Sequence, residues 1–135
     1  MAGGLSGSLL DTSVLIARDE AGAIELPEAA AISVITLGEL HAGVRIAKGE
    51  RTAGERRRRL AAVRAAFAPL VVDEAVAECY GDVLAVARAQ RRTVKATDLL
   101  IIATAAASGR ELHTFDAAQA RLAEAAGVPA KLISR

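Results

Sequence analysis

Short apolar runs alternate along the chain with longer segments of mixed polarity, a pattern typical of α/β proteins. Each short run is bounded by polar residues, glycine or proline, and is predicted to form a buried strand. In chain order, the predicted strands cover residues 9–10, 30–33, 70–72, 111–114 and 130–133. The predicted helices cover residues 12–18, 34–48, 51–67, 73–92, 97–107 and 117–126. This alternation predicts a single-domain α/β fold in which helices flank both faces of a parallel, twisted β-sheet.

Two of the predicted helices differ in how their apolar residues are distributed. The segment 97–107 is apolar on every side, so we expect a helix buried between layers. The segment 34–48 has a single apolar stripe, and Glu39 lies on that stripe. A glutamate in such a position either reaches out to water or meets a positively charged partner. Both interpretations stay open for Glu39 at this point.

The composition limits the class of protein. A chain of 135 residues is long enough for one domain with a substantial core, and with 53% apolar but only 2% aromatic residues that core must consist of aliphatic side chains. The single cysteine, Cys79, excludes an internal disulfide and favours a reducing, cytoplasmic location. No segment reaches the length of a membrane span. The Gly/Ser-rich residues 1–7 do not resemble a signal peptide and are predicted to be a flexible lead-in to a domain of residues 8–135.

Carboxylates stand at the ends of predicted strands and at the start of the buried helix. Asp11 follows the first strand directly, Asp116 follows the fourth, and Asp98 lies in the first turn of the segment 97–107. Each aspartate alone is explained equally simply as a helix cap. In a parallel sheet, however, right-handed connections bring strand ends to one edge, where gathered carboxylates would repel each other. The usual remedy is a hard divalent cation, Mg²⁺ or Mn²⁺, which takes oxygen ligands.

Four short motifs together resemble the acidic motifs of PIN-domain ribonucleases. They are L-L-D-T-S-V-L-I, T-L-G-E-L, A-T-D-L-L-I-I-A-T-A and H-T-F-D. The similarity covers residues 8–133 in the family's order and spacing, and the small size is similar to that of VapC-type toxins from bacterial toxin–antitoxin pairs. The resemblance implies a PIN-like fold whose catalytic, metal-binding residues are Asp11, Glu39, Asp98 and Asp116.

The same resemblance implies roles for further polar residues. Thr12, Ser13 and Thr114 match hydroxyls that flank the family's site and orient ligands or water. Some members of the family carry a further acid shortly after the fourth one. Here the residues that follow, 117–119, are Ala-Ala-Gln, which leaves the number of bound metal ions open.

The implied function is a Mg²⁺- or Mn²⁺-dependent endoribonuclease that cuts single-stranded or looped RNA, leaving a 5′-phosphate and a 3′-hydroxyl. The family also implies a homodimer and a cognate antitoxin protein that blocks the site. Arg91, Arg92 and Lys95 form an acid-free basic cluster just before Asp98 and are predicted to hold the RNA backbone. The arginines 56–59 wind around their helix and are predicted to be a solvated face. Because aromatic residues are scarce, we expect recognition by RNA shape rather than by base stacking.

Three other functions compete with this interpretation. The same acids would serve a nuclease that cuts DNA. A receiver-like phosphoacceptor domain would use Asp73 after the middle strand, but that fold needs an acidic pair after the first strand, where Thr12 and Ser13 stand. A catalytically inactive PIN-like binding module would not need the intact set of acids. Two histidines, His41 and His113, lack the motif of a serine hydrolase.

Overall fold

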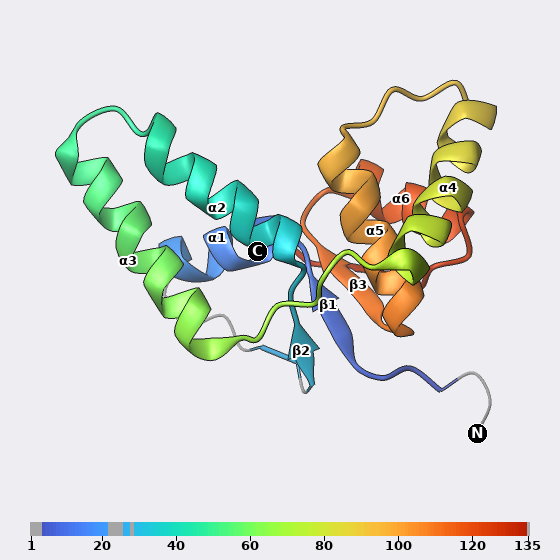
Figure 1. Ribbon diagram of the computed structural model, residues 1–135, viewed down its shortest axis with the longest axis horizontal. Helices are drawn as coiled ribbons and strands as arrows, with labels where there is room; N and C mark the ends of the chain where they lie inside the picture. The colour runs from blue at the N-terminus through green and yellow to red at the C-terminus, as the bar shows by residue number, and fades with distance from the viewer. Residues whose placement is uncertain (1–3, 22–25, 28, 135) are drawn as a thin grey trace.

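The computed structural model describes residues 4–21, 26–27 and 29–134. A four-stranded sheet forms the centre of the fold, in the order β2-β1-β3-β4, and all of its strands run parallel (Figure 1). The strands are β1 (Ser8–Leu10), β2 (Ala30–Ala31), β3 (Glu111–Thr114) and β4 (Ala130–Leu132). The predicted fold class is therefore confirmed. Residues 1–3 of the predicted lead-in and residues 22–25 of the loop after the first helix lie outside the described residues.

Helices cover the sheet from both sides. The helices of the first half of the chain lie on one side (Figure 1). They are α1 (Thr12–Ala21), α2 (Val34–Ile46) and α3 (Glu50–Ala66). On the other side lie the helices of the second half, which are α4 (Glu74–Ala89), α5 (Ala96–Ser108) and α6 (Ala117–Ala125). As the sequence predicts, α5 is the most deeply buried of these, and its C-terminus is set by Gly109 in a left-handed conformation with φ of 65°.

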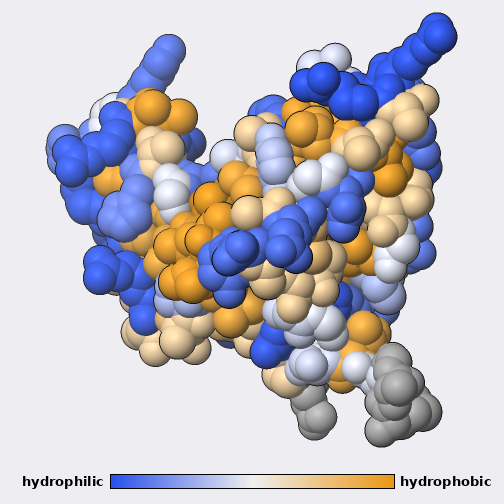
Figure 2. Space-filling view, turned by 45° about the vertical axis from the view of Figure 1, so that its right-hand side comes forward, coloured by the Kyte–Doolittle hydropathy of each residue, from blue (hydrophilic) through white to orange (hydrophobic). Residues whose placement is uncertain are grey.

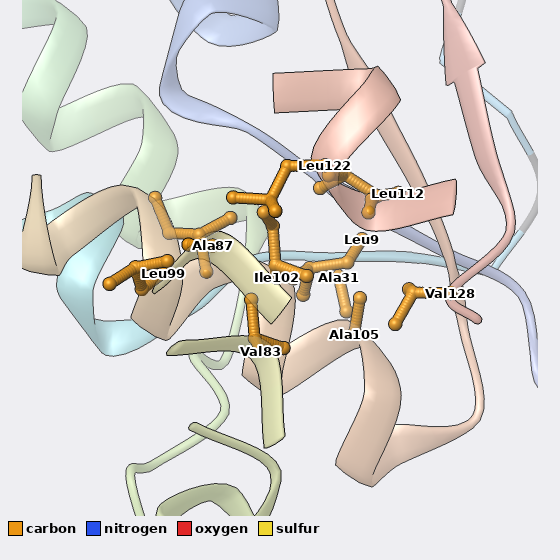
Figure 3. Packing of buried hydrophobic residues seen from close by; sticks show 12 residues of the cluster. Leu9, Ala31, Val83, Ala87, Leu99, Ile102, Ala105, Leu112, Leu122 and Val128 are labelled. Atoms are coloured by element: carbon orange, nitrogen blue, oxygen red, sulfur yellow. The ribbon is translucent and has the colours of Figure 1, made fainter. Parts of the chain in front are cut away.

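The core consists of two clusters, one on each face of the sheet. Successive residues of β1 point to opposite faces, so Leu9 belongs to one cluster and Leu10 to the other. Leu9 packs with Ile102 of α5 and Leu112 of β3, as Figure 3 shows. Leu10 packs with residues of α1, α2 and α3. This aliphatic packing on both sides holds the end of β1, and with it Asp11, in a fixed place.

The predicted strand at residues 70–72 is wrong. Leu70 forms a single parallel bridge with Ser33, in which the Leu70 amide donates to the Ile32 carbonyl at 2.9 Å. Val71 and Val72 are 64% and 40% exposed, and Asp73 already caps α4. The pairing stops because β2 and its short extension end at Ser33, which caps α2. Among the described residues, Val71 and Val72 therefore form no bridge.

No helix in the described part of the chain is long and apolar enough to cross a membrane.

Candidate active site

The site is built at the carboxyl edge of the sheet, where β1 and β3 end side by side. Leu10 is in register with His113, and the Asp11 amide donates to the His113 carbonyl at 2.9 Å. This bond places Asp11 beside Thr114, the last residue of β3. Asp11 is only 6% exposed, so its carboxylate must find hydrogen-bond donors inside the protein.

Two of the hydroxyls singled out in the sequence provide donors for Asp11. The Ser13 hydroxyl donates to Asp11 Oδ2 at 2.6 Å, and the Ser13 amide donates to the same oxygen at 3.2 Å. Thr114 Oγ1 lies 3.2 Å from that oxygen. The hydrogen bond from the Ser13 amide is the kind that an N-cap residue accepts at the start of a helix. The contacts with the Ser13 and Thr114 hydroxyls are not part of such a cap. The Asp11 carboxylate is thus oriented by its own turn and by the end of β3.

Glu39 reaches the same edge from α2. Its Oε1 accepts a hydrogen bond of 2.6 Å from the Thr12 hydroxyl, which lies 3.1 Å from the hydroxyl of Thr36. The sequence left two interpretations open for Glu39, a side chain that reaches water and one that meets a positive charge. Neither describes it fully, because Glu39 is half-buried and its hydrogen-bond partner in the described part of the chain is a hydroxyl. Thr12 therefore holds Glu39, as Ser13 and Thr114 hold Asp11.

Asp116 is both a helix cap and a member of the acidic set. Its Oδ1 accepts from the amides of Ala118 and Gln119, at 2.9 and 3.2 Å, at the N-terminus of α6. Asp116 is therefore the N-cap of α6, as one of the two interpretations of the sequence predicted. Asp116 is nevertheless exposed, and among the described residues its side-chain hydrogen bonds all go to Oδ1, so Oδ2 faces outward as a free acceptor.

Asp98 is the acid that a cap does not explain. The N-cap of α5 is Lys95, and Asp98 lies one turn further on, half-buried. Burial raises the pKa of the Asp98 carboxyl, and the ammonium of Lys95 opposes that rise. The charges of the other three acids of the set raise the pKa further. The charges of Asp11, Glu39 and Asp116 therefore all act on the Asp98 carboxyl.

The arrangement is an acidic site of oxygen donors only. In Figure 1, α2 and the first turn of α5 face each other across the upper part of the molecule, and the space-filling view in Figure 2 is hollowed there between two projecting parts. Within the described ranges, no three acidic, histidine or cysteine side chains are grouped closely enough to hold a metal ion as they stand. Asp11, Glu39 and Asp116 are instead each hydrogen-bonded to groups of their own. Their chemistry suits a hard divalent cation, which would draw them together.

The predicted RNA-binding cluster does not form a single surface. Arg92 donates from Nη2 to the Ala118 carbonyl at 3.0 Å, so its guanidinium ties the end of α4 to the start of α6. Arg91 and Lys95 are exposed, and Arg91 adopts a positive φ of 55° in the turn. Lys95 is also the cation whose charge acts on Asp98. Two of the three basic side chains are therefore available for a phosphate, and the third is engaged in the fold.

A groove of 420 Å³ extends from Glu39 toward α3, and sequence reasoning did not find it. The groove is lined by residues of three helices, among them Thr12, Glu39, Arg56 and Arg59. Arg56 donates to the Gly43 carbonyl at 2.7 Å, and Arg59 pairs with Asp19 at 3.0 Å. Only Arg57 and Arg58 of the four-arginine run are exposed in the way predicted for a solvated face.

Gln119 is a site residue that the sequence did not indicate. It appeared only as a position where some relatives carry an acid. In the structure its side chain is 5% exposed and donates from Nε2 to Asp11 Oδ1 at 3.3 Å. Its position three residues after Asp116, in the first turn of a helix that starts at the site, is the one signal that points to it.

The residues of the competing functions are engaged elsewhere. Asp73, which a receiver-like domain would phosphorylate, accepts from the Val76 amide at 3.0 Å as the cap of α4. His113 Nε2 lies 2.8 Å from Glu111 Oε1, and His41 is an exposed residue of α2. None of these three side chains forms a hydrogen bond to the side chains of the four acids in the described part of the chain.

The PIN domain family matches residues 8–125, and the chain belongs to that family. It is similar to Ribonuclease VapC8 of Mycobacterium tuberculosis, with 48% identity over 100 residues that cover 72% of this chain and 88% of the relative. It is also similar to Ribonuclease VapC4 of the same organism, with 41% identity over 63% of this chain and 65% of the relative.

Among solved structures, the chain is similar to one from VapBC-5 of Mycobacterium tuberculosis, a member of the VapBC family of toxin–antitoxin systems. The TM-score is 0.81 with 33% identity, and the match covers 95% of this chain and 99% of the other. The β2-β1-β3-β4 sheet with its two layers of helices is therefore the fold of a known toxin–antitoxin protein.

Proposed function

We propose that this chain is a divalent-metal-dependent endoribonuclease that acts as the toxin of a toxin–antitoxin pair. The observation that carries the proposal is the placement of four carboxylates around the carboxyl edge of the sheet: hydrogen bonds through Thr12, Thr114 and Gln119 position Asp11, Glu39 and Asp116, and Asp98 lies in the first turn of α5. Membership of the PIN family and the similarity to two ribonucleases support it.

The metal would be held by Asp11, Glu39, Asp98 and Asp116, and Mg²⁺ or Mn²⁺ suits these oxygen donors. When bound, such an ion makes hydroxide available near neutral pH and stabilises the charge on a phosphodiester under attack. The protein's own hydroxyls do the positioning. Ser13 and Thr114 orient Asp11, and Thr12 orients Glu39, so two of the four ligands are preorganised before the metal arrives.

The substrate we propose is RNA, and the location is the cytoplasm, where the single cysteine stays reduced. The partners we propose are a cognate antitoxin and a second copy of the chain. The antitoxin is supported by the likeness to a chain from a VapBC complex. An inactive binding module is the weaker candidate, because such a module has no use for four carboxylates gathered at one edge, three of them buried or half-buried.

The proposed reaction has a direct test. The purified chain should cleave single-stranded RNA in millimolar Mn²⁺ and stop when a chelator is added. A single-stranded DNA of the same sequence serves as the matched control, because a nuclease of the competing kind would cut it as well or better. Absence of RNA cleavage under any divalent metal would contradict the proposed function.

The exposed basic residues beside Asp98 should contribute to RNA binding. The double variant Arg91→Gln/Lys95→Gln is expected to bind RNA more weakly and to flatten the salt dependence by about 0.7 in log–log slope for each lost phosphate contact. The control is Arg57→Gln/Arg58→Gln, which removes two exposed arginines from α3. Arg92→Gln should instead lower the melting temperature, because it loses the bond to the Ala118 carbonyl. Fluorescence anisotropy at several salt concentrations measures the slopes. A stronger effect of the α3 variant would move the RNA to the exposed face of α3 that carries Arg57 and Arg58.

A further inference from the structure

Gln119 connects three parts of the acidic edge. Its Nε2 donates to Asp11 Oδ1 at 3.3 Å, and its Oε1 accepts from the Thr114 hydroxyl at 2.8 Å. Its backbone amide donates to Asp116 Oδ1 at 3.2 Å. One residue of α6 is therefore bonded to the acid after β1, to the hydroxyl at the end of β3 and to the acid that caps its own helix.

The orientation of the Gln119 amide is determined by its neighbours. A carboxylate accepts hydrogen bonds only, so the amide nitrogen must face Asp11. The amide oxygen then faces Thr114, whose hydroxyl has a single proton to donate. Thr114 Oγ1 also accepts from the Asp116 amide at 3.0 Å. Its proton has two acceptors within reach, Gln119 Oε1 at 2.8 Å and Asp11 Oδ2 at 3.2 Å, so Thr114 links Gln119 to Asp11 a second time.

The two oxygens of Asp11 are held by different groups. Oδ2 is bonded by Ser13 at the start of α1 and lies near Thr114 at the end of β3. Among the described residues, Gln119 is the donor that holds Oδ1. Without Gln119, the Asp11 carboxylate would still be anchored at Oδ2 but would be free to turn about that anchor.

A purely structural role does not account for this side chain. Its helix neighbours on the buried side are apolar, namely Ala120, Leu122 and Ala123. An apolar residue at this position would fill the same space, and a buried amide is unfavourable unless its polar atoms are bonded. Both side-chain bonds of Gln119 go to groups of the site rather than to the surrounding core.

We propose that Gln119 is a positioning residue that fixes the rotation of Asp11 and its placement relative to Asp116, and so sets the affinity of the site for a divalent cation. This inference rests on the proposed function. Groups that orient metal ligands from behind commonly change metal affinity by about 10–100-fold when they are removed. The Gln119 side chain bonds to Asp11 directly and to Thr114, which lies against both Asp11 and the Asp116 amide, so its loss should fall within that range.

The test uses Gln119→Met, which keeps the length of the side chain and removes both hydrogen bonds. Isothermal titration with Mn²⁺, in the absence of RNA, should show binding about 10–100-fold weaker than that of the parent. The matched control is Gln90→Met, the same change at an exposed position at the end of α4, which should bind Mn²⁺ like the parent. Binding of Mn²⁺ by a folded Gln119→Met variant within about twofold of the parent would overturn the inference.

Gln119→Glu keeps an acceptor for the Thr114 hydroxyl but places a second buried carboxylate beside Asp11. This variant tests the role of Gln119 even if the methionine variant fails to fold. It should melt lower than the parent in chelator and gain more from Mn²⁺ than the parent does. A structural role alone predicts equal losses in chelator and in Mn²⁺, which would overturn the inference. If the parent itself does not bind Mn²⁺, the proposed function is wrong and the inference falls with it. If the parent binds and the variants bind equally, only the inference is wrong.

Discussion

Replacing Asp98 by asparagine is expected to lower RNA cleavage by more than about 100-fold while the protein stays folded. Removal of a group that merely orients a metal ligand costs about 10–100-fold, so loss of a ligand itself should cost more. The fold should survive because Asp98 does not cap α5, whose N-cap is Lys95. The measurement is the initial rate of cleavage in Mn²⁺, together with relief of growth arrest when the variant is expressed.

The matched control is Asp73→Asn. Asp73 caps α4, and asparagine caps nearly as well as aspartate, so this variant should keep both its stability and its activity. It also tests the receiver-like alternative, which would need Asp73 as its phosphoacceptor. Cleavage by Asp98→Asn at the rate of Asp73→Asn would remove Asp98 from the catalytic set.

Much of the fold could be predicted because its signals are local. Leu9 and Leu10 indicate a buried strand, and their alternation between the two core clusters is the ordinary behaviour of β-structure. The run at residues 70–72 has the same local character but forms only one bridge, at Leu70. A strand forms only where a neighbouring segment offers backbone N–H and C=O groups to pair with, and the segment beside residues 70–72 becomes helix α2 after Ser33. The local pattern of apolar residues carries no information about that neighbouring segment.

The sequence indicated the four acids of the candidate site but not the groups around them. The order and spacing of the four motifs indicated Asp11, Glu39, Asp98 and Asp116, whereas the roles of Arg92 and Gln119 depend on contacts between distant segments. Arg92 bonds to a carbonyl 26 residues away, and Gln119 bonds to an acid 108 residues away. The sequence offered helix cap and metal ligand as alternative roles for each aspartate. Asp116 caps α6 with Oδ1 alone, and among the described residues Oδ2 accepts no hydrogen bond, so the two roles are compatible.

The second large effect expected from Asp98→Asn is on stability. In the metal-free protein, an ionised Asp98 is partly buried near three other carboxylates, which raises its pKa above the ordinary value. The native state therefore holds this proton at a pH where the unfolded chain has lost it, and stability falls as the pH rises through that interval. At neutral pH the burial of the charge and the repulsion together cost about 1 kcal/mol after allowance for solvent screening.

The asparagine variant escapes this repulsion. In chelator at neutral pH it should melt about 2–5 °C higher than the parent. The advantage should shrink as the pH is lowered and vanish below the ordinary pKa of an aspartate, because the parent's carboxyl is then protonated in both states. A cap residue would behave differently, since its replacement by asparagine leaves the melting temperature nearly unchanged.

Thermal melting in chelator and in millimolar Mn²⁺ tests most directly whether the four carboxylates form one cation site. A ligand that binds only the native state stabilises it by about 2.7 kcal/mol at a hundredfold excess over its dissociation constant. The parent should therefore melt several degrees higher in Mn²⁺ than in chelator. Asp98→Asn and Asp116→Asn should lose most of that gain, the latter while keeping the cap of α6. Equal melting temperatures of the parent in chelator and in Mn²⁺ would contradict the account.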